Sequence, residues 1–369
     1  MINPEFLAAL DGMAAKGVTK LTQLMRDKGK FIYIHDHKSG ARAKKYNLVR
    51  HSGTVWSMLT VASELALPHV RHAMVWLFKN HFHIYGHEEN FWFGKPQFCM
   101  GIEWHNHITL GANALALLAM AELQLRDPPE ENPNPIVIRT INELMYGIAS
   151  MYQPEADAFV HKWDITLVPI ADLVSDYYVG EALFAVLHWQ NVHRQINPIP
   201  DPLHEAIRSR MLQHMLKLAA DNYGLEFQSH WMMYAVSYAL LHWRLELSEA
   251  EQDVLLNYLV RLVTDVLDRT DYRKRNASTP IACRTEGMMA AMQIFLLPEI
   301  NRDAKYDEFI TRIMTHAEAN ILLQVGFVKP DGAIIRGGGA HGYNEVRIDY
   351  IQHSISSFKA FADIARRLQ

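Results

Sequence analysis

Two kinds of helix-forming segment alternate along the chain, and this alternation constrains the fold more than any other feature. Apolar residues recur at helical spacing through most of the sequence, and strand-like alternation is confined to short pieces such as residues 31–34. One kind of segment is amphipathic and carries its charged residues on one face, which predicts a helix exposed to solvent. Residues 202–220, 248–267 and 303–323 are examples.

The second kind of segment is rich in Ala, Gly, Ser, Met and aromatic residues on all sides, which predicts helices buried between neighbours. There are six such segments, at residues 51–65, 107–123, 181–189, 230–243, 286–296 and 352–365. Their starts lie about 50 to 75 residues apart, which is the length of a helical hairpin with its loop. An exposed helix is expected before each of them.

A short repeat links the two ends of the chain. The sequence Tyr-Asn-Leu-Val-Arg at residues 46–50 is nearly repeated as Tyr-Asn-Glu-Val-Arg at residues 343–347, and each copy leads into a buried segment. The first and last units are therefore expected to be equivalent and to meet. We predict an all-α fold, an (α/α)6 toroid of six inner and six outer helices. Residues 1–369 should form it as a single domain, because no stretch resembles a linker.

This alternation resembles the (α/α)6 toroid of the six-hairpin glycosidase superfamily. That superfamily includes unsaturated glucuronyl hydrolases and N-acylglucosamine 2-epimerase-like enzymes, and polysaccharide lyases have related toroids. The resemblance covers the whole chain as architecture, without the complete catalytic motif of any one member family. It implies a carbohydrate-active enzyme, although a fold alone does not fix a function.

Composition and charge narrow the range of partners. The formal net charge is −4 and there is no long basic run, so binding to nucleic acid or to an anionic membrane is not expected. Residues 1–20 lack the apolar centre of a signal peptide, and no stretch is apolar enough to span a membrane, which predicts a cytoplasmic protein. The two cysteines, Cys99 and Cys283, exclude a disulfide framework.

Clusters of polar residues lie at the starts of the six buried segments, where they would line a central funnel if the inner helices converge. Helix capping explains an Asp, Ser or Glu in a first turn, but it does not explain why His, Arg and Trp recur there. We therefore predict a shared polar pocket. The clusters are residues 50–51, 103–107, 176–181, 228–231, 284–286 and 347–353.

Four carboxyl groups in these clusters are candidates for acid and base catalysis: Glu103, Glu181, Glu286 and Asp349. Cleavage of a glycosidic bond uses one protonated and one ionised carboxyl group, whose pKa values are separated by burial and by nearby arginines. Glu286 and Asp349 are favoured because an arginine precedes each of them by two residues.

Aromatic and basic residues in the clusters suit an anionic sugar. Aromatic faces stack on pyranose rings, and the planar arginine side chain binds a carboxylate or phosphate through two hydrogen bonds. Each of these residues also has an ordinary explanation, as a core side chain or as a structural ion pair. The predicted substrate-binding residues are Arg50, His51, Trp104, Asn106, Tyr178, Trp231, Arg284, Arg347 and Gln352.

The primary prediction is a hydrolase of a small acidic or modified oligosaccharide, and three alternatives stay open. The pair Asn106 and His107 is similar to the Asn-His element of toroidal polysaccharide lyases, which implies a uronate lyase. His230 and His353 could instead be the bases of a sugar epimerase. The toroid could also bind a glycan or a protein without catalysis.

No metal and no cofactor are expected. Cys283 lies near the start of a buried segment and could belong to a zinc site like that of the toroidal lanthionine cyclases, but lone buried cysteines are usually inert. The glycine run at residues 337–339 follows Arg336 and suits an ordinary turn, a flexible lid or an anion-binding turn.

Overall fold

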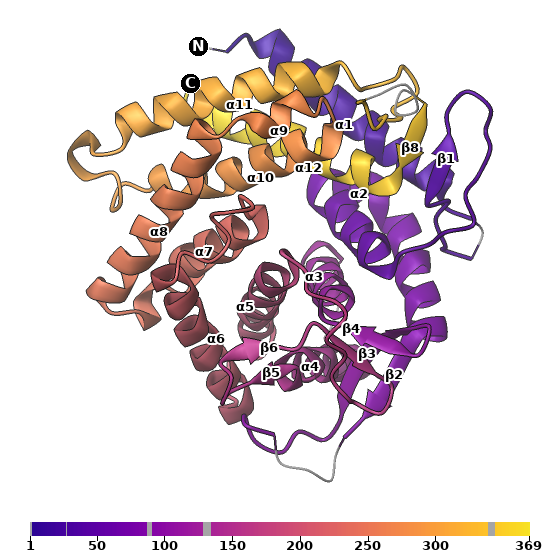
Figure 1. The fold of residues 1–369 in the computed structure, drawn as a ribbon, viewed down its shortest axis with the longest axis vertical. Coiled ribbons are helices and arrows are strands. Elements are labelled where there is room, and N and C mark those ends of the chain that lie inside the picture. The colour runs from indigo at the N-terminus through magenta and orange to yellow at the C-terminus, as the bar shows by residue number, and fades with distance from the viewer. Residues whose placement is uncertain (1, 27, 87–90, 128–133, 339–343) are drawn as a thin grey trace.

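The inner helices form a closed ring, which Figure 1 shows from one end. The computed structural model describes residues 2–26, 28–86, 91–127, 134–338 and 344–369. Each inner helix packs against the next along the chain, and the last returns to pack against the first. The inner helices are α2 (Leu48–His81), α3 (Leu110–Arg126), α5 (Tyr178–Ile196), α7 (His230–His242), α10 (Ser278–Phe295) and α12 (Ile348–Arg367).

Helix α2 belongs to both layers of the toroid. Ala62 leaves the helical conformation, with φ −152° and ψ 72°, and so divides α2 into segments 48–61 and 63–81. Nearly every residue of the first segment is buried, whereas the second buries only one stripe, which includes Val70, Met74 and Leu77. The first segment is therefore an inner helix and the second an outer helix.

The remaining outer helices are α1 (Pro4–Leu24), α4 (Pro135–Ser150), α6 (Pro202–Ala220), α8 (Glu249–Asp268) and α11 (Asp307–Val325). Together with segment 63–81 they make six, and one precedes each inner helix in the sequence. Asn3, Asn134, Asp201 and Ser248 cap the starts of α1, α4, α6 and α8 by accepting hydrogen bonds from first-turn amides. The predicted (α/α)6 toroid is confirmed.

Small residues allow the inner helices to lie close together. In α3, residues 110–122 are all buried, and α5 is buried from Val179 to His193. A Cβ atom added at Gly180 of α5 would lie 2.8 Å from the backbone of Trp231 in α7. The abundance of Gly and Ala in these segments therefore reflects close helix packing.

Short strands connect the helices at one end of the ring. Antiparallel strands β2 (Phe82–Tyr85), β3 (Cys99–Trp104), β4 (His107–Thr109) and β7 (Lys162–Asp164) form a sheet in that order. Strands β5 (Tyr152–Gln153) and β6 (Ala158–Phe159) form a second pair. Strand β1 (Ile34–Asp36) pairs with β8 (Glu345–Arg347), so the first and last units of the ring are joined.

The prediction of a buried helix from residue 107 needs a correction. Residues 107–109 form β4, and α3 begins only at Leu110. His105 and Asn106 have positive φ values of 54° and 62°, and this turn reverses the chain from β3 into β4. The structure also contains one helical turn, α9 (Asp271–Lys274), and two short 3-10 helices, η1 (Arg244–Glu246) and η2 (Arg302–Ala304). Within the described part of the chain, no helix has the length and apolarity needed to cross a bilayer.

Candidate active site

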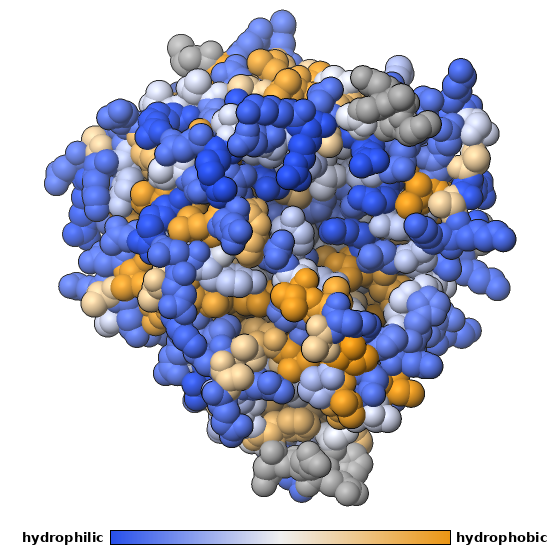
Figure 2. All heavy atoms as spheres, in the orientation of Figure 1, coloured by the Kyte–Doolittle hydropathy of each residue, from blue (hydrophilic) through white to orange (hydrophobic). Residues whose placement is uncertain are grey.

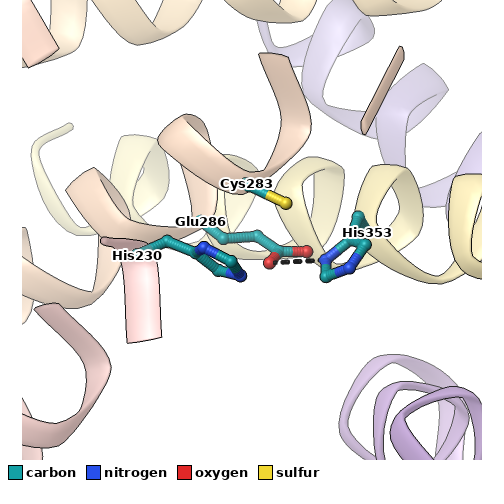
Figure 3. Close-up of side chains that lie close together, drawn as sticks. All are labelled: His230, Cys283, Glu286 and His353. Atoms are coloured by element: carbon teal, nitrogen blue, oxygen red, sulfur yellow. Dashed lines mark hydrogen bonds and ion pairs between the residues drawn. The ribbon is translucent and has the colours of Figure 1, made fainter. Parts of the chain in front are cut away.

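Four chemically active side chains converge at the centre of the ring. They are His230, the first residue of α7, Cys283 and Glu286 of α10, and His353 of α12. One side-chain donor atom of each lies within 4.8 Å of those of the others, and all four residues are buried. Figure 3 shows them pointing toward one another from three inner helices. Cys283 and Glu286 share one face of α10 because they are three residues apart.

His353 and Glu286 form a buried pair, with Nδ1 of the imidazole 3.1 Å from Oε2 of the carboxyl group. Burial alone would lower the pKa of His353, but the adjacent Cys283 and Glu286 outweigh burial and hold that pKa well above its ordinary value. This environment favours the protonated imidazole, although burial also raises the pKa of its partner, Glu286. The second oxygen of Glu286 has no hydrogen-bond partner among the described residues.

His230 has the opposite electrostatic environment. Its ring lies 5.6 Å from that of His353, nearly perpendicular to it, and only 3% of the residue is exposed. Burial lowers the pKa of His230 well below its ordinary value, and the positive charges of His353 and Arg284 act in the same direction. Neither ring nitrogen has a partner among the described residues. Since buried polar groups are normally paired, this neutral imidazole is available to a ligand or a water molecule.

Two arginines from opposite ends of the sequence meet at Asp349. Nε of Arg347 lies 2.6 Å from one oxygen of this buried carboxylate, and Nε of Arg50 lies 3.6 Å from the other. The near-repeat at residues 46–50 and 343–347 therefore ends in a shared ion pair where α2 meets α12; residue 343 lies outside the described residues. These arginines, which were predicted to bind an anionic substrate, are thus already in ion pairs with the carboxylate of Asp349.

Glu181, near the start of α5, also lies close to these groups. It is 1% exposed, and burial raises the pKa of Glu181 to about 8, although Arg50 and His353 oppose the shift. Its Oε2 atom has no partner among the described residues. At neutral pH Glu181 is therefore a protonated carboxylic acid that can donate a hydrogen bond.

A cavity of about 550 Å³ reaches this cluster at Cys283. Its wall includes Arg284, Arg347 and Tyr177, and it opens beside α9 and β8. Figure 2 shows hydrophilic residues gathered over this part of the face, whereas apolar residues are more frequent over the strands lower in the view. Polar solutes can therefore approach the cluster from this side.

The structure does not bring all of the predicted residues to this cavity. Glu103, Trp104, Asn106 and His107 belong to the hairpin of β3 and β4, where the carboxyl group of Glu103 accepts a hydrogen bond from the amide of Asn106. Trp104, His107 and Tyr178 line a different hollow of about 340 Å³. These residues were expected at the start of an inner helix, and the hairpin displaces the first four of them from it.

Three other residues predicted to contact substrate lie in the packed core. His51 is fully buried, and its ring nitrogens contact the hydroxyl of Tyr46 and the carbonyl oxygen of Ala73. Trp231 is 1% exposed and packs among the aromatic rings of the core. Gln352 accepts a hydrogen bond from Thr54 and thereby joins α12 to α2. Each of these side chains holds the ring together instead of lining the cavity at Cys283.

Cys283 was not among the residues predicted to act on or bind a substrate. Its three-residue spacing from Glu286 on a helix was available in the sequence and indicates a shared face. A thiol, two imidazoles and a carboxyl group are a donor set that zinc accepts, so these four residues are the ones that could hold a metal. In this structure two of these four side chains, His353 and Glu286, are instead joined to each other by a hydrogen bond.

The comparisons with known proteins agree with the architecture. The sequence matches no known family model and no curated protein. Among solved structures, a cellobiose 2-epimerase from Spirochaeta thermophila DSM 6192 is similar, with a TM-score of 0.67 at 12% identity over 99% of each chain. A sugar epimerase from a ruminal bacterium has a TM-score of 0.60 at 13% identity, over 98% of this chain and 99% of that one. An unsaturated glucuronyl hydrolase specific for heparin has a TM-score of 0.62 at 10% identity over 99% of each chain. The chain shares the (α/α)6 fold of these solved structures.

Proposed function

We propose that this protein is a carbohydrate-active enzyme that moves a proton at the carbon next to a sugar carbonyl, as an epimerase or an aldose–ketose isomerase does. One observation carries the proposal: His230 and His353 face each other in a buried cluster, 5.6 Å apart between ring centroids, beside a cavity. The likeness to two sugar epimerases supports it. The substrate is a small carbohydrate, and the arginines at the cavity favour an anionic one.

The two imidazoles have complementary roles in this reaction. His230 is neutral and has free nitrogens, so it can take the proton from C2 of an open-chain aldose. The electron pair of the broken C–H bond then moves toward C1, and the carbonyl oxygen gains negative charge as an enediolate. His353, protonated and held by Glu286, can donate a proton to this intermediate. Donation to the opposite face of C2 re-forms the C1 carbonyl and gives the 2-epimer. Donation to C1, with the proton of the C2 hydroxyl moving to the C1 oxygen, gives the ketose.

Hydrolysis is the second candidate, because the cavity region also holds the elements of a carboxyl pair. Glu181 is protonated at neutral pH and could protonate a glycosidic oxygen. Asp349, fixed between Arg50 and Arg347, could act as the ionised partner. The likeness to the heparin-specific glucuronyl hydrolase fits this reading. The geometry favours proton transfer by histidine, because catalysis by two carboxyl groups would leave the unpartnered ring nitrogens of His230 without a role.

Substitution of the histidines tests the proposal. His230→Asn and His353→Asn should each lower the rate of epimerisation or isomerisation by roughly 100- to 10,000-fold, the usual contribution of a general acid or base. The substrates are glucose, mannose and cellobiose with their 6-phosphates, and products are separated by chromatography. His242→Asn is the matched control, because His242 lies at the exposed far end of the same helix, α7. Equal rates for all three variants would overturn the proposal.

A further inference from the structure

We propose that the cavity beside Cys283 binds a tetrahedral oxyanion, a phosphate or sulfate group carried by the substrate. The proposal rests on the proposed function, because it places the anionic end of the sugar whose reacting carbon meets His230 and His353. The site lies between the start of α10 and residues 336–338, outside the acid and base groups themselves.

The wall of the cavity carries an excess of positive charge. The cavity is lined by Arg275, Arg284, Arg336 and Arg347, and none of its described lining residues is acidic. Arg347 is paired with Asp349, and Arg284 donates to the neutral oxygens of Gln228 and Phe227. The guanidinium groups of Arg275 and Arg336 have no hydrogen-bond or ion-pair partner among the described residues. Three of the four positive charges are therefore not neutralised by an acidic partner.

Among the described residues, no ion pair joins the neighbouring acids to Arg275 or Arg284. Asp176, Glu226 and Asp271 line an adjoining hollow, which shares Arg275 and Arg284 with the cavity. Asp271 forms an ion pair with Lys274 at 2.6 Å, and Asp265 forms one with the nearby Arg269. The arginines therefore attract an anion in the cavity, and no acidic side chain among the described lining residues repels it.

Two glycines allow the chain to bring Arg275 and Arg336 to the same cavity. Gly337 and Gly338 have φ values of 73° and 62°, a conformation that favours glycine. A Cβ at Gly337 would lie 2.5 Å from the carbonyl oxygen of Asn276, and one at Gly338 would lie 2.7 Å from that of Arg275. Only glycine lets segment 336–338 lie directly on residues 275–276. This contact places Arg336 beside Arg275, although 61 residues separate them in the sequence.

The start of α10, an 18-residue helix, also lines the cavity. The N-cap residue, Ala277, has no side chain that can accept a hydrogen bond, and the amide of Ser278 donates to the carbonyl oxygen of Arg336 instead. Because Pro280 has no N–H, Thr279 is the residue of the first turn whose amide can be offered to an anion. The hydroxyl of Thr279 is buried and has no partner among the described residues. The partial positive charge of a helix start adds to that of the arginines, and such a start favours phosphate groups.

The position of this anion site relative to the cluster suits one substrate molecule. Thr279, Cys283 and Glu286 are four and seven residues apart, so all three lie on one face of α10. With a rise of about 1.5 Å per residue, Cys283 lies about 6 Å along the helix from Thr279, and Glu286 about 10 Å. A sugar bound through its phosphate or sulfate at the start of α10 thus extends along this face toward His353.

Binding measurements on the full chain test the site. Calorimetry with glucose 6-phosphate, glucose 6-sulfate and glucose should give tighter binding of both esters than of glucose. Arg275→Gln and Arg336→Gln should each weaken ester binding by roughly 10- to 100-fold, as expected for loss of a charge-assisted hydrogen bond to the anion. Arg367→Gln is the control, because Arg367 is exposed at the end of α12, and it should leave ester binding unchanged.

Two further comparisons distinguish a phosphate group from a sulfate group and distinguish failure of the anion site from failure of the proposed reaction. A phosphate ester loses charge below about pH 6, so its binding should weaken there while that of the sulfate ester does not. Equal affinity for esters and for glucose, or equal losses in Arg336→Gln and Arg367→Gln, would overturn the anion site. If the wild type then still exchanges the C2 proton of glucose, only this inference fails; if esters bind tightly without exchange, only the proposed reaction fails.

Discussion

His230 and His353 are the same residue type in opposite states. Both are buried, but only His353 has Glu286 as a hydrogen-bond partner, and only His230 has two free ring nitrogens. Their pKa values move in opposite directions from the ordinary value, which separates an acid from a base. This division was not visible in the sequence, because it depends on which side chains from α7, α10 and α12 meet.

The buried acid Glu181 should make folding stability depend on pH. The unfolded chain releases this proton near pH 4.5, whereas the native state keeps it to about pH 8. Between these values the native state binds more protons, so stability falls as pH rises, by at most about 1.4 kcal/mol per pH unit. Glu181→Gln removes this contribution. In urea unfolding at pH 5 to 8, the variant should lose less stability toward high pH than the wild type.

The matched control for this series is Glu308→Gln, because Glu308 is exposed on the outer helix α11. It should follow the pH dependence of the wild type. If the curves of Glu181→Gln and the wild type run parallel, Glu181 is ionised in the native state and cannot serve as a carboxylic acid donor.

The cluster of His230, Cys283, Glu286 and His353 leads to a prediction about metal content. Coordination by the cluster would require deprotonated His353 and loss of its hydrogen bond to Glu286. We therefore expect elemental analysis of purified protein to find no stoichiometric zinc, and chelators to leave turnover intact. One zinc per chain that is absent from Cys283→Ser but present in Cys99→Ser would show instead that the cluster is a metal centre.

At the scale of elements, helical periodicity predicted most of the fold. The segment predicted at residues 202–220 coincides with α6, and the six buried segments all overlap inner helices. The failures occur where local turn geometry overrides periodicity. Residues 107–109 continue a helical pattern, but the turn at His105 and Asn106 makes them a strand. Arg275 and Arg336 were not predicted as site residues, because only the backbone contact through Gly337 brings them together.

Close packing of the inner helices gives a prediction for glycine. Gly180→Ala would place a methyl group 2.8 Å from the backbone of Trp231 and Met232, so α5 and α7 must move apart. We expect a loss of roughly 1 to 3 kcal/mol in the free energy of unfolding. Gly12→Ala is the control, because Gly12 lies in α1 with no atom within 4 Å of a new Cβ. It should gain roughly 0.5 to 1 kcal/mol from helix propensity. Similar effects of the two changes on urea unfolding would contradict this packing.

At the scale of the whole molecule, ring closure creates the site. The near-repeat at the two ends of the chain predicted that the first and last units meet, and β1 pairs with β8 while α12 packs on α2. The curvature of the ring brings His353 of α12 to Glu286 of α10 and His230 of α7, and its closure brings Arg50 from the first inner helix to Asp349 of the last. The sequence could indicate that such a funnel exists and which residue types enter it. It could not show which of them touch, because contacts across a ring join residues far apart in the chain.

Solvent exchange tests proton transfer at carbon most directly. The wild type is incubated in D2O with glucose, mannose, cellobiose and their 6-phosphates, and proton NMR follows the signal of the hydrogen at C2. If His230 removes that proton and His353 returns one, deuterium should appear at C2 of the 2-epimer, or at C1 of the ketose. Products released by glycosidic cleavage with no deuterium on carbon would contradict the account and assign the funnel to a carboxyl-dependent hydrolase.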